Sequence, residues 1–246
     1  MSLINYKTSN PVFSRYVWKQ SRSSASKMTL NGIFFKSLFA IFLVGLTTWF
    51  VWDLVYKGVD VKWYTSGGLL AAIFFSVLTS FKRTWAVITT PLYALSKGLF
   101  LGGISAYAEL KFEGIPMRAV SVTILTFFVM LILYKAKLVV VTKRFRSVIV
   151  TSIVTIMTIY IINWILSIFG VNLPFIWGTS WFAIGFNAVA ALVASFSLLL
   201  DFDFIDRKLH RAPKYFEWVA TWGLLVTLIW LYVEVLRLMK KMAIRF

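Results

Sequence analysis

The chain has 246 residues, of which 60% are hydrophobic and only 14% are charged. Soluble domains carry roughly 25% charged residues, so a single water-exposed domain could not bury this much apolar surface, and a soluble enzyme is excluded. The absence of cysteine and the single histidine, His210, exclude disulfides and metal sites built from thiolates or several imidazoles.

The net charge of +17 comes from basic residues that lie between the apolar runs. Nucleic-acid-binding proteins gather such charge on one face or helix, whereas membrane proteins place it in loops beside anionic headgroups. We therefore predict contacts with a lipid bilayer and none with nucleic acid. Residues 1–27 are polar and basic, so we expect no cleavable signal peptide.

Seven apolar runs are candidates for bilayer-crossing helices, which take roughly 20 residues; the second run is short and could extend toward Trp63. They cover residues 33–56, 67–81, 85–107, 117–138, 148–169, 175–200 and 216–238. Barrel strands would be shorter and would alternate apolar with polar residues. The sequence therefore predicts an all-α integral membrane protein, a seven-transmembrane-helix bundle over residues 31–240. A basic cytoplasmic segment, 1–30, precedes the bundle, and a short basic tail, 241–246, follows it.

The orientation follows from the distribution of lysine and arginine, which favour cytoplasmic loops. Seven spans place twice as many basic residues on the side of the N-terminus as on the other side, which predicts a cytoplasmic N-terminus. The four basic residues after 236 fall on the minority side. A re-entrant last segment would move them across, but its 23 residues are long enough to cross, and we favour seven spans.

The acidic residues that could act inside the bundle lie late in the chain, at Asp201, Asp203, Asp206, Glu217 and Glu234. On a helix that turns about 100° per residue, Asp201 and Asp203 lie roughly 200° apart, and Asp203 and Asp206 roughly 60° apart. Only part of this triplet can therefore face the interior, where acids are functional by default. The alternative is a solvated helix end paired with the basic residues that follow.

Lys97 falls near the middle of the third run. A cation there is costly and needs a carboxylate, backbone carbonyls or water. It could form an ion pair that locks two helices together, or serve as a counter-charge or plug for the late acids. Lys36, one turn inside the first run, is expected to extend toward the headgroups.

Small residues recur every four positions at Gly98, Gly102 and Ala106. This spacing predicts a face on which two membrane helices approach closely.

Enzyme motifs are missing from the sequence. It has no phosphate-binding glycine loop, HExxH or GxSxG motif. An intramembrane aspartyl dyad would need acids on two spans at one depth, and only Glu217 and Glu234 could partner the aspartates. We expect no enzyme and no cofactor.

Several segments together form a recognisable pattern. They are Asn10-Pro-Val-Phe13, Met28-Thr-Leu-Asn-Gly32, residues 91–106, residues 139–146, the 201–206 run, and Ala212-Pro-Lys-Tyr-Phe-Glu-Trp218 with the span that follows to Arg237. With these segments the chain resembles the Bax inhibitor family of membrane proteins, in its bacterial branch, over nearly its whole length. The resemblance implies a seven-helix bundle with a central last helix.

The resemblance also implies a pH-sensitive calcium leak, in which an aspartate late in the sixth helix pairs with one in the seventh. Asp201 looks like the first member of that pair, and Asp203 is a near alternative. The second member is missing: Thr227 stands near its place, and Glu217 and Glu234 lie at other depths. Lys97 is a further departure, since related bacterial chains are expected to carry an acid there.

Two functions stay open. The first is a pH-responsive cation leak in a cell inner membrane, with calcium or protons as the transported ions. Its candidate pore and pH-sensing residues are Asp201, Asp203, Asp206, Glu217, Glu234 and Lys97. The second is a non-conducting protein that binds or stabilises other membrane proteins or lipids.

Overall fold

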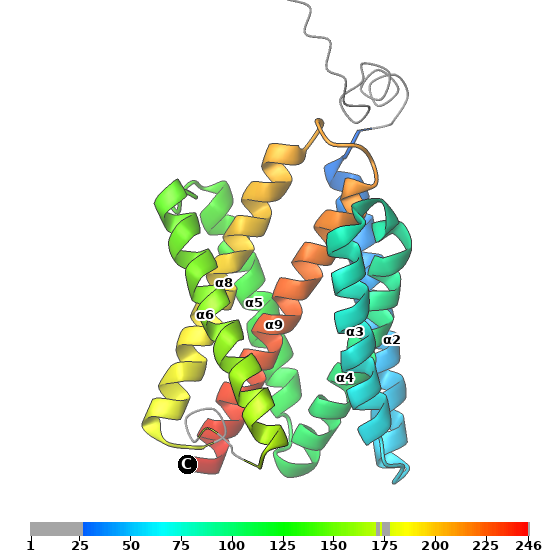
Figure 1. Ribbon diagram of the computed structural model, residues 1–246, viewed down its shortest axis with the longest axis vertical. Helices are drawn as coiled ribbons and strands as arrows, with labels where there is room; N and C mark the ends of the chain where they lie inside the picture. The colour runs from blue at the N-terminus through cyan, green and yellow to red at the C-terminus, as the bar shows by residue number, and fades with distance from the viewer. Residues whose placement is uncertain (1–26, 171–172, 174–177, 246) are drawn as a thin grey trace, which may run out of the picture.

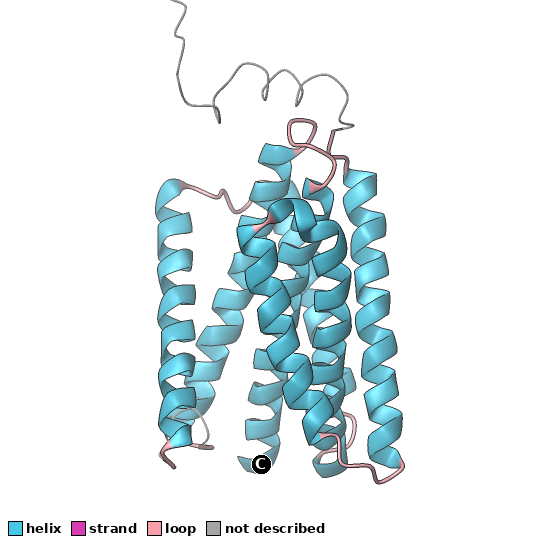
Figure 2. Ribbon diagram, turned by 45° about the vertical axis from the view of Figure 1, so that its right-hand side comes forward, coloured by secondary structure: helices cyan, strands magenta, loops and turns pink. Residues whose placement is uncertain are grey.

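The computed structural model describes residues 27–170, 173 and 178–245, in which seven long helices connect two ends of a bundle (Figures 1 and 2). The helices are α2 Leu30–Tyr56, α3 Lys62–Phe81, α4 Ala86–Lys111, α5 Ile115–Lys135, α6 Lys143–Ile168, α8 Trp181–Lys208 and α9 Phe216–Arg245, with a short 3-10 helix, η2 Arg83–Trp85, before α4. All seven are long and apolar enough to span a membrane. The predicted all-α seven-helix membrane bundle is confirmed.

Three of the helices begin where a side chain can cap them. Thr29, Thr142 and Ser180 each accept the backbone N–H of the third residue beyond, at 3.1 to 3.2 Å. These bonds satisfy N–H groups that have no partner within the helix. Helix α5 instead begins after Gly114, whose φ of 77° suits glycine.

Each helix extends past one end of the apolar run that predicted it, because polar residues at helix ends can lie among the headgroups. Helix α3 begins at Lys62 rather than at residue 67. Helix α9 continues through Arg245, so residues 241–245 are not the separate tail that we expected. Lys241 donates to the carbonyl of Ala183 at 3.2 Å, and this bond helps to hold the last turns against α8.

Some predicted features lie outside the described residues. Residues 1–26, most of the predicted basic N-terminal segment, are among them, and so is the Asn10-Pro-Val-Phe13 segment. The start of the run predicted at 175–200 is also outside, and the described helix there begins at Trp181.

Helix α9 lies at the centre of the bundle. It packs against α2 and α4 on one side and against α5 and α8 on the other, and Figure 1 shows it crossing diagonally between these two groups. In its most apolar stretch 67% of the residues are buried, against 11% in α2. Its two ends lie at opposite ends of the bundle (Figure 1), so the last segment crosses fully and is not re-entrant.

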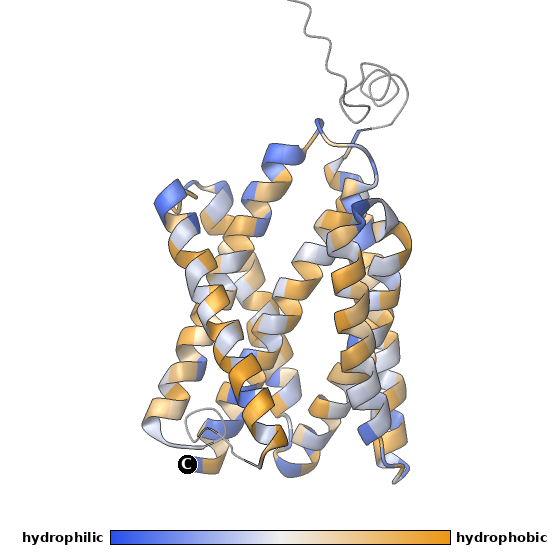
Figure 3. Cartoon of the chain, in the orientation of Figure 1, coloured by the Kyte–Doolittle hydropathy of each residue, from blue (hydrophilic) through white to orange (hydrophobic). Residues whose placement is uncertain are grey.

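We call the two ends of the bundle the N-side and the C-side. The N-side holds the start of α2 and the connections α3–α4, α5–α6 and α8–α9; the C-side holds the end of α9 (Figure 1). Hydrophobic residues line the length of the helices, and hydrophilic ones gather near both ends (Figure 3). Large apolar side chains such as Phe34, Ile161 and Phe182 face outward and are more than half exposed. A surface of this kind fits hydrocarbon and not water.

Helices α2 and α4 approach closely at the predicted small residues. A Cβ atom on Gly102 would lie 2.8 Å from the carbonyl oxygen of Thr48 and 2.7 Å from the Cβ of Val51. Gly98 likewise faces Val44 and Thr47. The predicted small-residue face is confirmed, and α2 is the helix that packs on it.

Candidate functional site

Asp201 points from α8 toward the central helix. The hydroxyl of Thr227 on α9 donates to Asp201 Oδ2 at 2.6 Å. Thr227 stands near the position where the resemblance implies a second acid. Asp201 and this position are therefore in contact, but a hydroxyl replaces the second carboxylate. Within the described part of the chain, Asp201 forms no ion pair.

A cavity of about 260 Å³ lies next to Asp201. Its polar lining includes Ser80 and Arg83, which come from the α3–α4 region on the N-side. Trp222 also lines it, and its indole Nε1 is buried with no hydrogen-bond partner among the described residues. A space of this size with several polar groups has room for water, so the cavity can hydrate Asp201 from the N-side.

Asp203 and Asp206 face away from this cavity and line a different one, of about 360 Å³. Asp203 forms ion pairs with Arg146 at the start of α6 and with Arg207 at 2.8 Å. Asp206 accepts the Tyr134 hydroxyl at 3.1 Å and lies 3.7 Å from Lys135 Nζ. Both carboxylates therefore connect helix ends at the N-side. This arrangement agrees with the alternative interpretation of these two aspartates, a helix end with local ion pairs.

Glu217 is fully buried in the first turn of α9. It accepts the backbone N–H and the hydroxyl of Thr29, each at 3.0 Å, and forms an ion pair with Lys36. Lys36 thus turns inward to this carboxylate, contrary to the expectation that it extends toward the headgroups, because the buried charge of Glu217 needs a counter-charge. The arrangement joins the starts of α2 and α9.

Glu234 is fully buried in the C-side half of α9. It accepts the Tyr160 hydroxyl at 2.8 Å, the Asn187 amide at 2.9 Å and the Trp230 indole N–H at 3.1 Å. Arg237 forms an ion pair with it at 3.3 Å. These four donor groups surround the carboxylate, and two of them, on Tyr160 and Asn187, tie α6 and α8 to α9.

Lys97 forms no ion pair and no hydrogen bond among the described residues; its Nζ lies 5.9 Å from the ring centroid of Tyr93 and 5.3 Å from that of Phe100. The predicted roles as a helix-locking ion pair and as a counter-charge to the late acids are therefore wrong for this structure. The faces of the Tyr93 and Phe100 rings, and not a carboxylate, stabilise the Lys97 ammonium.

Sequence reasoning found the acids but missed most of their partners. Thr29, Arg146, Tyr160 and Asn187 were not among the candidates. One signal was available: neutral polar residues inside apolar runs, such as Tyr160 and Asn187, need partners in hydrocarbon. Among the described residues, no three of the His, Asp and Glu side chains are close enough together to hold a metal ion.

Of the known proteins, structures and families compared with the chain, one family matches it. Neither the curated proteins nor the solved structures contain a match to the chain. Among protein families, the one described as Bax inhibitor 1 like matches residues 10–244, which is nearly the whole chain. Together with the seven-helix bundle around a central last helix, this match shows that the chain belongs to the Bax inhibitor 1-like family.

Proposed function

We propose that the protein is a pH-responsive leak for cations, located in a cell inner membrane with its N-side toward the cytoplasm. One observation carries the proposal. Of the four acids that reach the bundle interior, Asp203, Glu217 and Glu234 are ion-paired, and Asp201 alone has no cationic partner among the described residues.

An unpaired carboxylate beside a hydratable cavity can gain or lose a proton without breaking the bundle. In its charged form Asp201 accepts the hydrogen bond from Thr227 and lowers the barrier to a cation entering from the N-side. Protonation removes that charge. We therefore expect cation flux to fall as the pH on the N-side falls.

The small number of protein oxygens around Asp201 favours a path that selects only weakly among cations. Calcium takes six to eight oxygen ligands, and Asp201, Thr227 and Ser80 supply only a few. Calcium would have to keep most of its water here. The ion is transported and is not a resident cofactor, and the proposal includes no enzymatic activity.

Liposomes that hold the purified chain and a cation-sensitive dye test the proposal. We expect Asp201→Asn to lower flux at neutral pH and to flatten its pH dependence, because a neutral amide replaces the titrating group. Asp206→Asn is the matched control, since Asp206 lies on the same helix but lines another cavity, and it should leave both properties unchanged. Thr227→Asp restores the second acid that the resemblance implies, and we expect it to steepen the pH dependence.

Wild-type liposomes that are silent at every pH would contradict the proposal. An Asp201→Asn variant with the pH profile of the wild type would contradict the role of Asp201.

A second function, a non-conducting protein that binds or stabilises other membrane proteins, is favoured by Lys97. A cation near the middle of α4 with only aromatic contacts opposes the passage of other cations. Electrically silent bilayers, together with co-purification of a membrane protein in constant stoichiometry, would support this function over the leak.

A further inference from the structure

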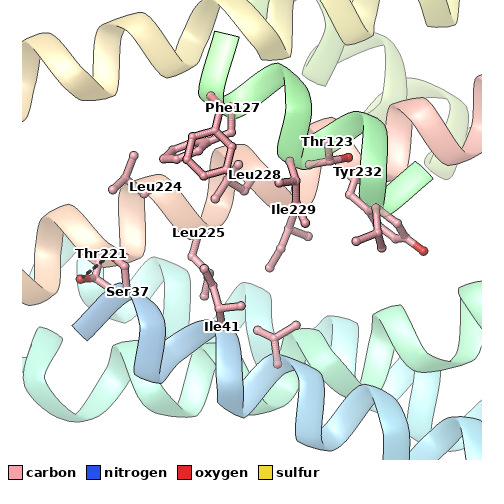
Figure 4. Close-up of a pocket in the computed structure, with 14 residues that line it drawn as sticks. Ser37, Ile41, Thr123, Phe127, Thr221, Leu224, Leu225, Leu228, Ile229 and Tyr232 are labelled. Atoms are coloured by element: carbon pink, nitrogen blue, oxygen red, sulfur yellow. Dashed lines mark hydrogen bonds between the residues drawn. The ribbon is translucent and has the colours of Figure 1, made fainter. Parts of the chain in front are cut away.

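We propose that a glycerophospholipid occupies a furrow between α2 and α5, with an acyl chain along the floor formed by α9 and its phosphate at Lys135 and Lys137. The furrow consists of three adjoining cavities of about 360 to 400 Å³ each. Figure 4 shows the middle one, with α2 and α5 as its walls. The proposal is independent of Asp201 and of the leak.

The three cavities are continuous because neighbouring ones share lining residues. Ser37, Phe127 and Leu224 line both the N-side cavity and the middle one. Ile41, Val120 and Tyr232, among others, line both the middle cavity and the C-side one. On α5 the lining extends from Pro116 to Lys135, about 28 Å at 1.5 Å per residue, which is close to the thickness of the hydrocarbon core.

The middle of the furrow offers no polar group to water or to an ion. Its polar side chains already bond within the protein: Ser37 with Thr221 at 3.3 Å, Thr123 with the Ala119 carbonyl at 2.8 Å, and Tyr232 with Ser105 at 2.7 Å. The rest of the lining is aliphatic or aromatic. A surface of this kind fits a hydrocarbon chain and does not fit an aqueous path.

The furrow opens sideways to the bilayer. Ile41, Ile124 and Phe128 line it, yet each remains about half exposed. An acyl chain from the surrounding lipid can therefore enter without any movement of the helices.

At the N-side the furrow meets a charged cavity of about 360 Å³, with which it shares Tyr134, Lys135 and Asp206. Lys137 and Arg207 also line this cavity. The Lys137 ammonium forms no ion pair or hydrogen bond within the described residues, and the carboxylates there already have cationic partners. Surplus positive charge at headgroup depth, directly beside an apolar furrow, fits a lipid phosphate.

Native mass spectrometry of the full chain, purified in mild detergent and titrated with dioleoyl-phosphatidylglycerol, tests the site. We expect one retained phospholipid per chain. Ile41→Trp fills the furrow from a half-exposed position, and we expect it to weaken retention by about tenfold. Ile161→Trp is the matched control: Ile161 is 57% exposed on α6, against 48% for Ile41, and it lines none of the furrow cavities.

The headgroup contact has its own test. The double variant Lys135→Gln, Lys137→Gln should lose the preference for phosphatidylglycerol over dioleoylglycerol, which lacks the phosphate. Lys82→Gln, Lys214→Gln removes the same charge from two exposed residues that line neither the furrow nor its charged cavity and should keep that preference.

Equal lipid retention by the two tryptophan variants would overturn the proposal. So would equal binding of dioleoylglycerol and phosphatidylglycerol by the wild type. A dimer that Ile41→Trp turns into a monomer would assign the furrow to a second copy of the chain and would overturn it too.

Discussion

Glu234 illustrates how a single buried charge is stabilised in this bundle. A carboxylate in hydrocarbon is costly unless it is paired and hydrogen-bonded, and here an arginine, a tyrosine, an asparagine and a tryptophan all donate to it. Glu217 at the other end of α9 is stabilised by Lys36 and Thr29. These two acids hold helices together, whereas Asp201 has a hydroxyl donor, Thr227, and no cationic partner among the described residues.

Tyr160→Phe tests the network around Glu234. It removes one donor to a buried carboxylate, and we expect the free energy of unfolding to fall by about 1–3 kcal/mol. Thermal unfolding in detergent measures the change. Tyr107→Phe is the control, because the hydroxyl of Tyr107 has only an exposed contact with Asp60 at 3.4 Å and should change stability by less than about 0.5 kcal/mol. Equal effects of the two variants would show that the Glu234 network contributes no stability.

The positions of these acids could be read from the sequence, and their partners could not. Asp201 and Asp203 were expected on opposite faces, and they do line different cavities. The partners Arg146 and Tyr160 lie 57 and 74 residues away from the acids they bind. No local periodicity encodes a contact between distant helices, so only the packed bundle reveals it.

At the scale of the helices, the small residues of α4 set how closely α2 can pack. Gly98 and Gly102 leave room for the backbone and side chains of α2. Packing between membrane helices depends on such close contact, because lipid provides no hydrophobic force between them.

Gly102→Ala should separate these two helices. Its Cβ would lie 2.8 Å from a backbone carbonyl oxygen, so we expect a loss of about 1–3 kcal/mol of stability from overpacking. Gly185→Ala on α8 is the control, since no atom beyond the neighbouring backbone of α8 itself lies within 4 Å of its Cβ position. There we expect no loss, and a gain of up to about 1 kcal/mol from helix propensity. The melting temperatures of both variants in detergent give the comparison; a Gly102→Ala variant as stable as the wild type would contradict this packing.

The helix positions were largely predictable, because hydrocarbon demands a run of about 20 apolar residues for each span. The positions of the helix ends were less predictable from the sequence. Helix α3 begins five residues before its apolar run, at Lys62, and α9 continues through Lys240 and Lys241. Long basic side chains can end a hydropathy window without ending a helix.

At the scale of the whole molecule, the basic residues predict an N-side that faces the cytoplasm. The absence of native cysteine makes this easy to test with single cysteines and a membrane-impermeant maleimide. Lys57→Cys, in the α2–α3 connection, should react on intact cells. Lys82→Cys, in the α3–α4 connection, should react only after permeabilisation. The reverse pattern would place the N-side outside, and the wild type provides the unlabelled control.

Helix α9, on which α2, α4, α5 and α8 pack, is the last of the seven in chain order. During synthesis α2 to α8 enter the membrane before α9 exists, so until then Glu217 and Thr227 are not there to meet Lys36 and Asp201. Assembly of the bundle must therefore wait until α9 has been synthesised. A chain that stopped after α8 would have every earlier span in place and a hollow centre.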